Sequence, residues 1–131
     1  MNKKILIIEN SPDFFNILAI ELKHRNYELV VTSDGFDAFR KAQKENPDLI
    51  LIDVVLPKLD GLSVCKLIKA KPTMKMIPVI ITTSIIGENI NHITNRAKAD
   101  VVIERKNNHK ELISIIEEFL TMKETPEAIE K

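Results

Sequence analysis

The stretch ILIIENSP, Ile5 to Pro12, joins an apolar run to a polar corner and to the expected start of a helix. The apolar run is short, continuous and mostly β-branched, which is typical of a strand buried on both faces of a sheet. Ser11 can cap a helix, and Pro12 is favoured at the first position of one. The stretch therefore predicts a buried strand, a polar link at Glu9 and Asn10, and a helix directly after it.

The same alternation of strand and helix recurs along the chain. Further apolar runs predict strands at 49–52, 79–81 and 101–103, and a more polar run predicts another at 28–32. Between them, apolar residues at helical spacing predict helices. Their inner faces comprise Phe14, Ile17, Leu18 and Leu22, then Ala38, Phe39 and Ala42, then Leu62, Cys65 and Ile68, then Ile90, Ile93 and Ala97, and finally Leu112, Ile116 and Phe119.

The order βαβαβαβαβα predicts one α/β domain, in which a doubly wound, five-stranded parallel sheet lies between two layers of helices. We expect the domain to span residues 1–120, and residues 121–131 to form a charged tail or linker. Two helix ends carry signals of their own. The second helix must end before Asn46, which precedes a proline, and Asn108 with Glu111 forms a capping box at the last helix.

Composition excludes several classes of function. The 131-residue chain carries 19 basic and 19 acidic residues, so its charge gives no general attraction to nucleic acid or to an acidic membrane. No apolar run approaches the ~20 residues of a membrane span, and the N-terminus lacks a signal-peptide core. Cys65 is the single cysteine, which excludes a disulfide framework or a thiolate metal site within one chain. These features predict a cytoplasmic protein, with Cys65 in its core.

Four of the expected strands end in polar residues. These are Glu9 and Asn10 after the first strand, Asp53 after the third, Thr83 after the fourth and Arg105 after the fifth. Ligands of parallel α/β sheets bind outside the carboxyl ends of the strands. We therefore expect two carboxylates, an amide, a hydroxyl and a cation at one rim.

A carboxylate in such a setting can accept a phosphoryl group as an acyl phosphate. Phosphoryl transfer needs mainly positioning and neutralisation of the phosphoryl oxygens, and Mg²⁺ supplies the positive charge. Oxygen ligands for Mg²⁺ are available from Asp53, Asn10 and the backbone carbonyl of Val55. Glu9 can act on the same ion through a water molecule.

The remaining phosphoryl oxygens need hydrogen-bond donors. The hydroxyl of Thr83 and the cation of Arg105 are placed to provide them, and Lys106 is an alternative to Arg105. The two cations are not equivalent, because arginine offers a planar fork and lysine a compact ammonium group.

The most specific motif is PDLILIDVVLPKLDG, Pro47 to Gly61, in which an aspartate is followed by a proline four residues later and a glycine eight residues later. SDG at 33–35 and IPVIITTS at 77–84 accompany it. With these motifs, the region from Lys3 to Leu120 resembles a receiver domain of the two-component response regulators, the CheY-like superfamily. The resemblance implies a flavodoxin-like fold with strand order 2-1-3-4-5.

The resemblance also implies a function in phosphorelay signal transduction. Asp53 would be the phosphoacceptor, loaded by a histidine kinase or a phosphotransfer protein, and Thr83 the switch hydroxyl. The loaded state would change the binding of a downstream protein partner, or form a phosphorylation-dependent homodimer. Such a domain is not an enzyme beyond catalysing its own phosphorylation and dephosphorylation.

The chain departs from the family pattern at several positions. Asn10 replaces an acidic residue, Arg105 and Lys106 replace a lysine followed by a proline, Val102 stands where an aromatic switch residue is common, and Lys98 replaces a glycine before the fifth strand. The charge missing at Asn10 predicts weak Mg²⁺ binding.

Two other functions stay open at this point. The departures favour a pseudo-receiver, which keeps the fold and acts as a protein-interaction module without phosphorylation. A flavodoxin-like cofactor binder would need a phosphate loop rich in serine, threonine and glycine after the first strand. Residues 9–13 are instead acidic and contain a proline, which argues against a cofactor binder.

Overall fold

The computed structural model describes residues 2–84, 89–105 and 109–122. The predicted alternation of strands and helices is confirmed. The strands are β1 (Lys4–Ile8), β2 (Glu28–Thr32), β3 (Leu49–Asp53), β4 (Val79–Thr83) and β5 (Val101–Glu104). The helices are α1 (Pro12–His24), α2 (Gly35–Glu45), α3 (Gly61–Ala70), α4 (Asn89–Ala97) and α5 (Lys110–Met122).

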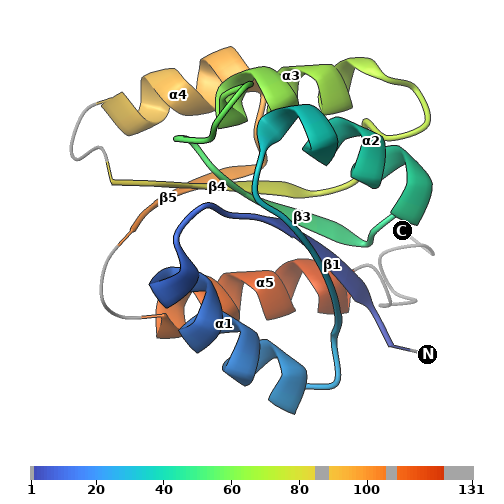
Figure 1. Ribbon diagram of the computed structural model, residues 1–131, viewed down its shortest axis with the longest axis vertical. Helices are drawn as coiled ribbons and strands as arrows, with labels where there is room; N and C mark the ends of the chain where they lie inside the picture. Colours follow the sequence, from blue (N-terminus) through green and yellow to red (C-terminus); the bar gives the residue numbers. More distant parts are fainter. Residues whose placement is uncertain (1, 85–88, 106–108, 123–131) are drawn as a thin grey trace.

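The strands form one parallel sheet in the order β2-β1-β3-β4-β5, as expected. Ile5 of β1 pairs with Leu29 on one side and with Leu49 on the other, so β1 lies inside the sheet. Figure 1 shows α1 and α5 on one face of the sheet and α2, α3 and α4 on the other. The chain is therefore a three-layer, doubly wound α/β fold of the flavodoxin-like type.

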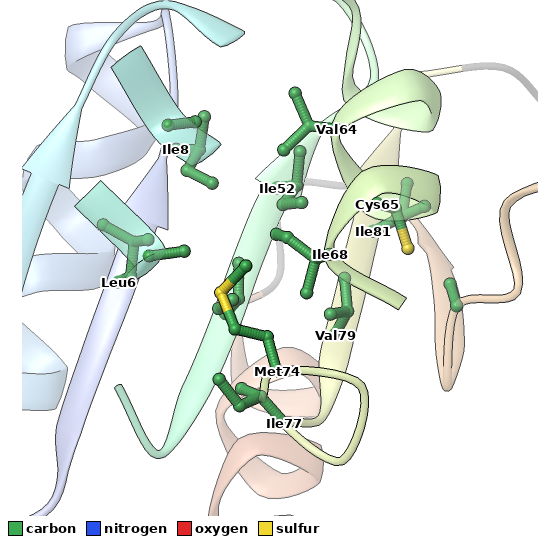
Figure 2. Packing of buried hydrophobic residues seen from close by; sticks show 14 of the residues in the cluster. Leu6, Ile8, Ile52, Val64, Cys65, Ile68, Met74, Ile77, Val79 and Ile81 are labelled. Atoms are coloured by element: carbon green, nitrogen blue, oxygen red, sulfur yellow. The ribbon is translucent and has the colours of Figure 1, made fainter. Parts of the chain in front are cut away.

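Each face of the sheet contributes to its own hydrophobic core. Alternate residues of β1 point to opposite faces, so Leu6 and Ile8 pack under α2 and α3 while Ile5 and Ile7 pack against α1 and α5. Figure 2 shows the first of these clusters. Cys65 is fully buried in it, as predicted, and burial raises the pKa of its thiol to about 12. No helix in the described ranges is long and apolar enough to cross a membrane.

The inner face of α1 differs from the prediction. Ile17 is 54% exposed, and the buried residues of this helix are Leu18, Ala19 and Leu22. Leu18 and Leu22 of the predicted stripe are therefore confirmed, while Ala19 takes the inward place expected for Ile17. Helical spacing places both Ile17 and Ala19 beside Leu18, and packing against the sheet and α5 buries Ala19.

The C-terminal ends of α2 and α4 agree with the sequence. Helix α2 ends at Glu45, as the position of Asn46 before a proline predicted, and Asn46 is its C-cap with φ 47°. Lys98 directly follows α4 with φ 61°, the left-handed conformation that a glycine adopts most easily. The capping box involves Asn108, which lies outside the described residues. Helix α5 runs to Met122, slightly beyond the expected domain boundary.

Two glycines bring the loop between β3 and α3 against the rest of the domain. The amide of Gly61 donates to the carbonyl of Val54, and a Cβ atom at this position would overlap the carbonyl oxygen of Asp53. A Cβ atom on Gly35 would likewise overlap the carbonyl oxygen of Leu59. Both glycines of the sequence motifs are thus required for close backbone approach, and together they fix the loop that follows Asp53.

Replacing Lys98 with glycine is expected to stabilise the protein by about 0.5–1 kcal/mol. The left-handed conformation costs a non-glycine residue roughly 1–2 kcal/mol, and glycine removes this cost. The greater conformational freedom of glycine in the unfolded chain partly offsets the gain. Asn46→Gly is the matched control, because asparagine tolerates a positive φ and gains less. Urea unfolding measures both free energies. A Lys98→Gly variant no more stable than wild type would contradict this expectation.

Gly61→Ala is expected to lower the free energy of unfolding by about 1–3 kcal/mol, because the added methyl group forces the β3–α3 loop away from Asp53. Lys66→Ala, at an exposed position of α3, serves as the control and should change stability by less than about 0.5 kcal/mol. Denaturant unfolding compares the two. Equal stability of the two variants would contradict this expectation, because it would show that the β3–α3 loop can move without loss of stability.

Candidate functional site

The candidate site lies where four neighbouring strands end. Glu9 directly follows β1, Asp53 closes β3, Thr83 closes β4 and Arg105 directly follows β5. These strands are consecutive in the sheet order β1-β3-β4-β5, and all are parallel. The carboxyl ends of parallel strands meet at one edge, so the fold gathers the predicted residues there.

Glu9 is 6% exposed, and both of its carboxylate oxygens have partners. Oε2 accepts hydrogen bonds from the amides of Asn10, at 3.1 Å, and Ser11, at 2.9 Å. Oε1 accepts a bond from Nη2 of Arg105 at 2.6 Å. Ser11 stands at the N-cap of α1 as predicted, but its side chain makes no capping hydrogen bond. The carboxylate of Glu9, rather than the Ser11 hydroxyl, therefore orders the entry into α1.

Asp53 is 9% exposed and points its carboxylate toward the same cation. Its Oδ1 accepts a hydrogen bond from the amide of Val55 at 3.3 Å, and its Oδ2 lies 3.4 Å from Nη2 of Arg105. Burial raises the pKa of the Asp53 carboxyl, and the positive charge of Arg105 opposes the rise. Burial raises the pKa of Glu9 in the same way, again against the pull of Arg105.

Arg105 joins the two carboxylates to β4. Its Nη2 atom lies within reach of Glu9 and Asp53 and also donates to the hydroxyl of Thr82 at 3.1 Å. The guanidinium carbon lies 3.9 Å from the centroid of the Phe14 ring. The backbone amide of Arg105 donates to the carbonyl of Thr83, which fixes where its side chain begins. One arginine therefore contacts residues from three segments of the sheet edge and from α1.

The remaining predicted residues occupy different surroundings. Thr83 is buried at the end of β4, whereas the side chain of Asn10 is exposed beside Glu9. The side chain of Val55 is also exposed, while its amide faces Asp53. Lys106, the alternative to Arg105, lies outside the described residues. The structure thus brings Glu9, Asp53 and Arg105 into direct contact and leaves Asn10 at the rim.

Sequence reasoning missed two participants. Thr82 was passed over in favour of its neighbour, although β-strand register places it directly beside Asp53. Phe14 was predicted as a core residue of α1, and it does pack at the margin of that core. Its ring also supports the guanidinium of Arg105. Strand pairing could have identified Thr82, but no local signal marks a contact between α1 and the end of β5.

The oxygens at this edge fit Mg²⁺. The carboxylates of Glu9 and Asp53 concentrate negative charge there, and carboxylate oxygens are ligands that Mg²⁺ prefers. Among the described residues, no group of three or more histidine, cysteine, aspartate or glutamate side chains could hold a metal ion by itself. A cation held by the two carboxylates would need further oxygen ligands, for which the amide of Asn10, the backbone carbonyl of Val55 and water are the candidates.

Comparison with known proteins gives a consistent result. Residues 5–117 match the family described as the response regulator receiver domain. The alkaline phosphatase synthesis transcriptional regulatory protein PhoP of Bacillus subtilis is 40% identical over 84 residues, which are 64% of this chain and 34% of the relative. The chain thus spans about a third of the length of this curated relative.

Two solved structures are also similar. One is the receiver domain of a sensor histidine kinase of Pseudomonas aeruginosa with a magnesium ion in its active-site cleft, with 25% identity, a TM-score of 0.83 and coverage of 92% of this chain and 99% of that one. The other is the phosphorylated cyanobacterial phytochrome response regulator RcpA, with 31% identity, a TM-score of 0.77 and coverage of 92% and 95%.

The fold, the motifs and the family match agree. Receiver domains carry no enzymatic activity beyond the chemistry of their own phosphorylation, and they partner with histidine kinases. The chain belongs to the response regulator receiver domain family, the CheY-like domains of two-component phosphorelay signalling.

Proposed function

We propose that Asp53 accepts the phosphoryl group, from a histidine kinase or a phosphotransfer protein. One observation carries the proposal: the Asp53 carboxylate ends a central strand, is nearly buried, and faces the guanidinium of Arg105. A nucleophile beside a fixed cation is the arrangement that phosphoryl transfer needs, because the transferred group brings negative charge. The phosphorylated relative RcpA is consistent with this use of the fold.

The transfer is a substitution at phosphorus. A carboxylate oxygen of Asp53 attacks the phosphorus of a phosphohistidine, forming a P–O bond as the P–N bond breaks. The electron pair of the broken bond goes to the imidazole nitrogen, which then takes a proton from solvent. The product is an acyl phosphate on Asp53, and water later hydrolyses it back to the carboxylate.

Mg²⁺ is the proposed cofactor, held by Asp53, Asn10 and the backbone carbonyl of Val55, with Glu9 acting through water. When bound, it supplies positive charge to the phosphoryl oxygens. The magnesium ion in the cleft of the Pseudomonas domain supports a divalent cation at this place. The amide of Asn10 is neutral, so the chain contributes two carboxylates here, and we expect the affinity for Mg²⁺ to be low.

The other donors act on the phosphoryl group itself. Thr83, buried at the end of β4, is the proposed switch hydroxyl, and Arg105 the proposed cation, with Lys106 as the alternative. Arginine can bind two phosphoryl oxygens with its planar fork. Contact of Thr83 and Arg105 with the new phosphoryl group would draw the ends of β4 and β5 toward Asp53 and bias the conformation of the α4 side of the domain.

The output of this domain is proposed to be a change in protein binding. Its partners would be a downstream protein or a second, phosphorylated copy of the same domain, and the neutral overall charge gives no reason to expect direct binding to nucleic acid. We place the domain at residues 1–120, with 121–131 as a tail or linker, in the cytoplasm.

One observation favours a second candidate function. Arg105 already contacts both Glu9 and Asp53, so part of their negative charge is offset without a metal ion or a phosphoryl group. A pseudo-receiver would use this closed state permanently and act as a phosphorylation-independent interaction module. The two functions differ in one measurable respect, namely whether Asp53 gains a phosphoryl group.

Incubation with acetyl phosphate and Mg²⁺, followed by intact-mass measurement, tests the choice. The wild type is expected to gain the mass of one phosphoryl group, and Asp53→Asn is expected to gain none, because the amide is not a nucleophile. Asp13→Asn, which changes an exposed aspartate of α1, is the control and should load like the wild type. No mass gain by the wild type at saturating Mg²⁺, or an undiminished gain by Asp53→Asn, would rule out Asp53 as acceptor.

A further inference from the structure

Arg105 is held by more than its ion pairs. Its guanidinium carbon lies over the ring of Phe14, 3.9 Å from the ring centroid. Phe14 in turn lies against the imidazole of His109, with the ring centroids 4.9 Å apart. A cation over an aromatic face is attracted by the ring quadrupole. Rings from α1 and from the residue before α5 thus support the same side chain whose Nη2 binds the carboxylates.

The position of Arg105 also has a cost. Its Nε atom is buried and has no hydrogen-bond partner among the described residues. An unsatisfied buried donor is unfavourable, so this placement does not use the full donor capacity of the guanidinium. The contacts with Phe14 and Glu9 therefore favour the observed position of Arg105. The unpaired Nε favours any other position in which it would find a hydrogen-bond acceptor.

The carboxylates bound by Arg105 are the ones that a divalent cation would need. Oε1 of Glu9 is engaged by Nη2 at 2.6 Å, and Oε2 is engaged by the amides of Asn10 and Ser11. Oδ2 of Asp53 is 3.4 Å from the same nitrogen. Both carboxylate oxygens of Glu9 thus have partners already, and a second cation at this edge has to share them with Arg105 or replace it.

The geometry points to Arg105 as a built-in competitor of Mg²⁺, with Phe14 as the positioning residue that holds it in the competing place. This inference rests on the metal-binding part of the proposed function. Two positive charges that need the same carboxylate disfavour each other, so the binding of one weakens the binding of the other. Release from Glu9 also leaves the guanidinium available for phosphoryl oxygens on Asp53. Binding of Mg²⁺ is thereby linked to the availability of the Arg105 guanidinium for phosphoryl oxygens.

Substitutions of Phe14 test this link better than substitutions of Arg105 do. Removing Arg105 would raise the affinity for Mg²⁺ through space, whatever the side chain touched, because it removes a positive charge. Phe14→Leu keeps the charge and an apolar side chain of similar size but removes the aromatic face. Phe14→Tyr keeps that face and is the matched conservative variant. The difference between these two variants therefore reports on the aromatic support of Arg105 at constant charge.

The experiment is a calorimetric titration of Mg²⁺ into wild type, Phe14→Leu, Phe14→Tyr and Asn10→Asp. Phe14→Leu is expected to bind Mg²⁺ about two- to fivefold more tightly than wild type, the factor that corresponds to a cation–π contact of ordinary strength. Phe14→Tyr should stay within about twofold of wild type. Asn10→Asp should bind more tightly, because it adds a carboxylate at the same corner. Far-UV circular dichroism checks that each variant is folded.

Three results would overturn the inference: equal affinity of wild type and Phe14→Leu, an equal gain in Phe14→Tyr, or no Mg²⁺ binding by any of the four proteins. Failure of the proposed function has a different signature. In that case the affinities follow the expected order, and the competition stands, but Asp53 takes up no phosphoryl group from acetyl phosphate in the same samples.

Discussion

Two carboxylates buried side by side repel each other, and the domain depends on one cation that holds them together. Burial raises the pKa of both Glu9 and Asp53, which shows that the surroundings disfavour their charged forms. Arg105 opposes that effect by contacting both groups through one nitrogen. A buried carboxylate without a partner would be costly, so the cation is a condition for keeping this pair at the edge of the sheet. The same unfavourable burial makes the edge receptive to any further positive charge.

The fold supplies the rigidity that this arrangement needs. Glu9, Asp53, Thr82 and Arg105 come from four adjacent parallel strands, so sheet hydrogen bonds fix their spacing. The loop after Asp53 is pressed against the strand by the glycine at position 61, where no side chain would fit. Hydrophobic cores on both faces hold the strands from above and below, and Figure 1 shows that helices cover each face. The packed β-branched residues of the strands thus hold in place the polar residues that follow them at this edge.

Most of the fold could be predicted from the sequence, because apolar runs and helical spacing are local signals. It also located Glu9, Asp53, Thr83 and Arg105 at one rim, since each directly follows or closes a strand. The contacts among them could not be predicted in the same way. The ion pair between Arg105 and Glu9 was not anticipated, because it joins residues that lie far apart in the sequence. The support of Arg105 by Phe14 also joins distant segments, and only the packed structure reveals it. The exposed Ile17 shows the same limit on a smaller scale.

The central claim is that one edge binds the phosphoryl group at Asp53 and that Arg105 changes partner when it does. A crystal structure of the protein with Mg²⁺ and beryllofluoride, a phosphoryl analogue, tests the claim most directly. The account predicts beryllofluoride on the Asp53 carboxylate, the guanidinium of Arg105 in contact with the fluorines, and the ion pair with Glu9 broken. Beryllofluoride bound at Asp53 while Arg105 still pairs with Glu9, as it does in the present structure, would contradict it.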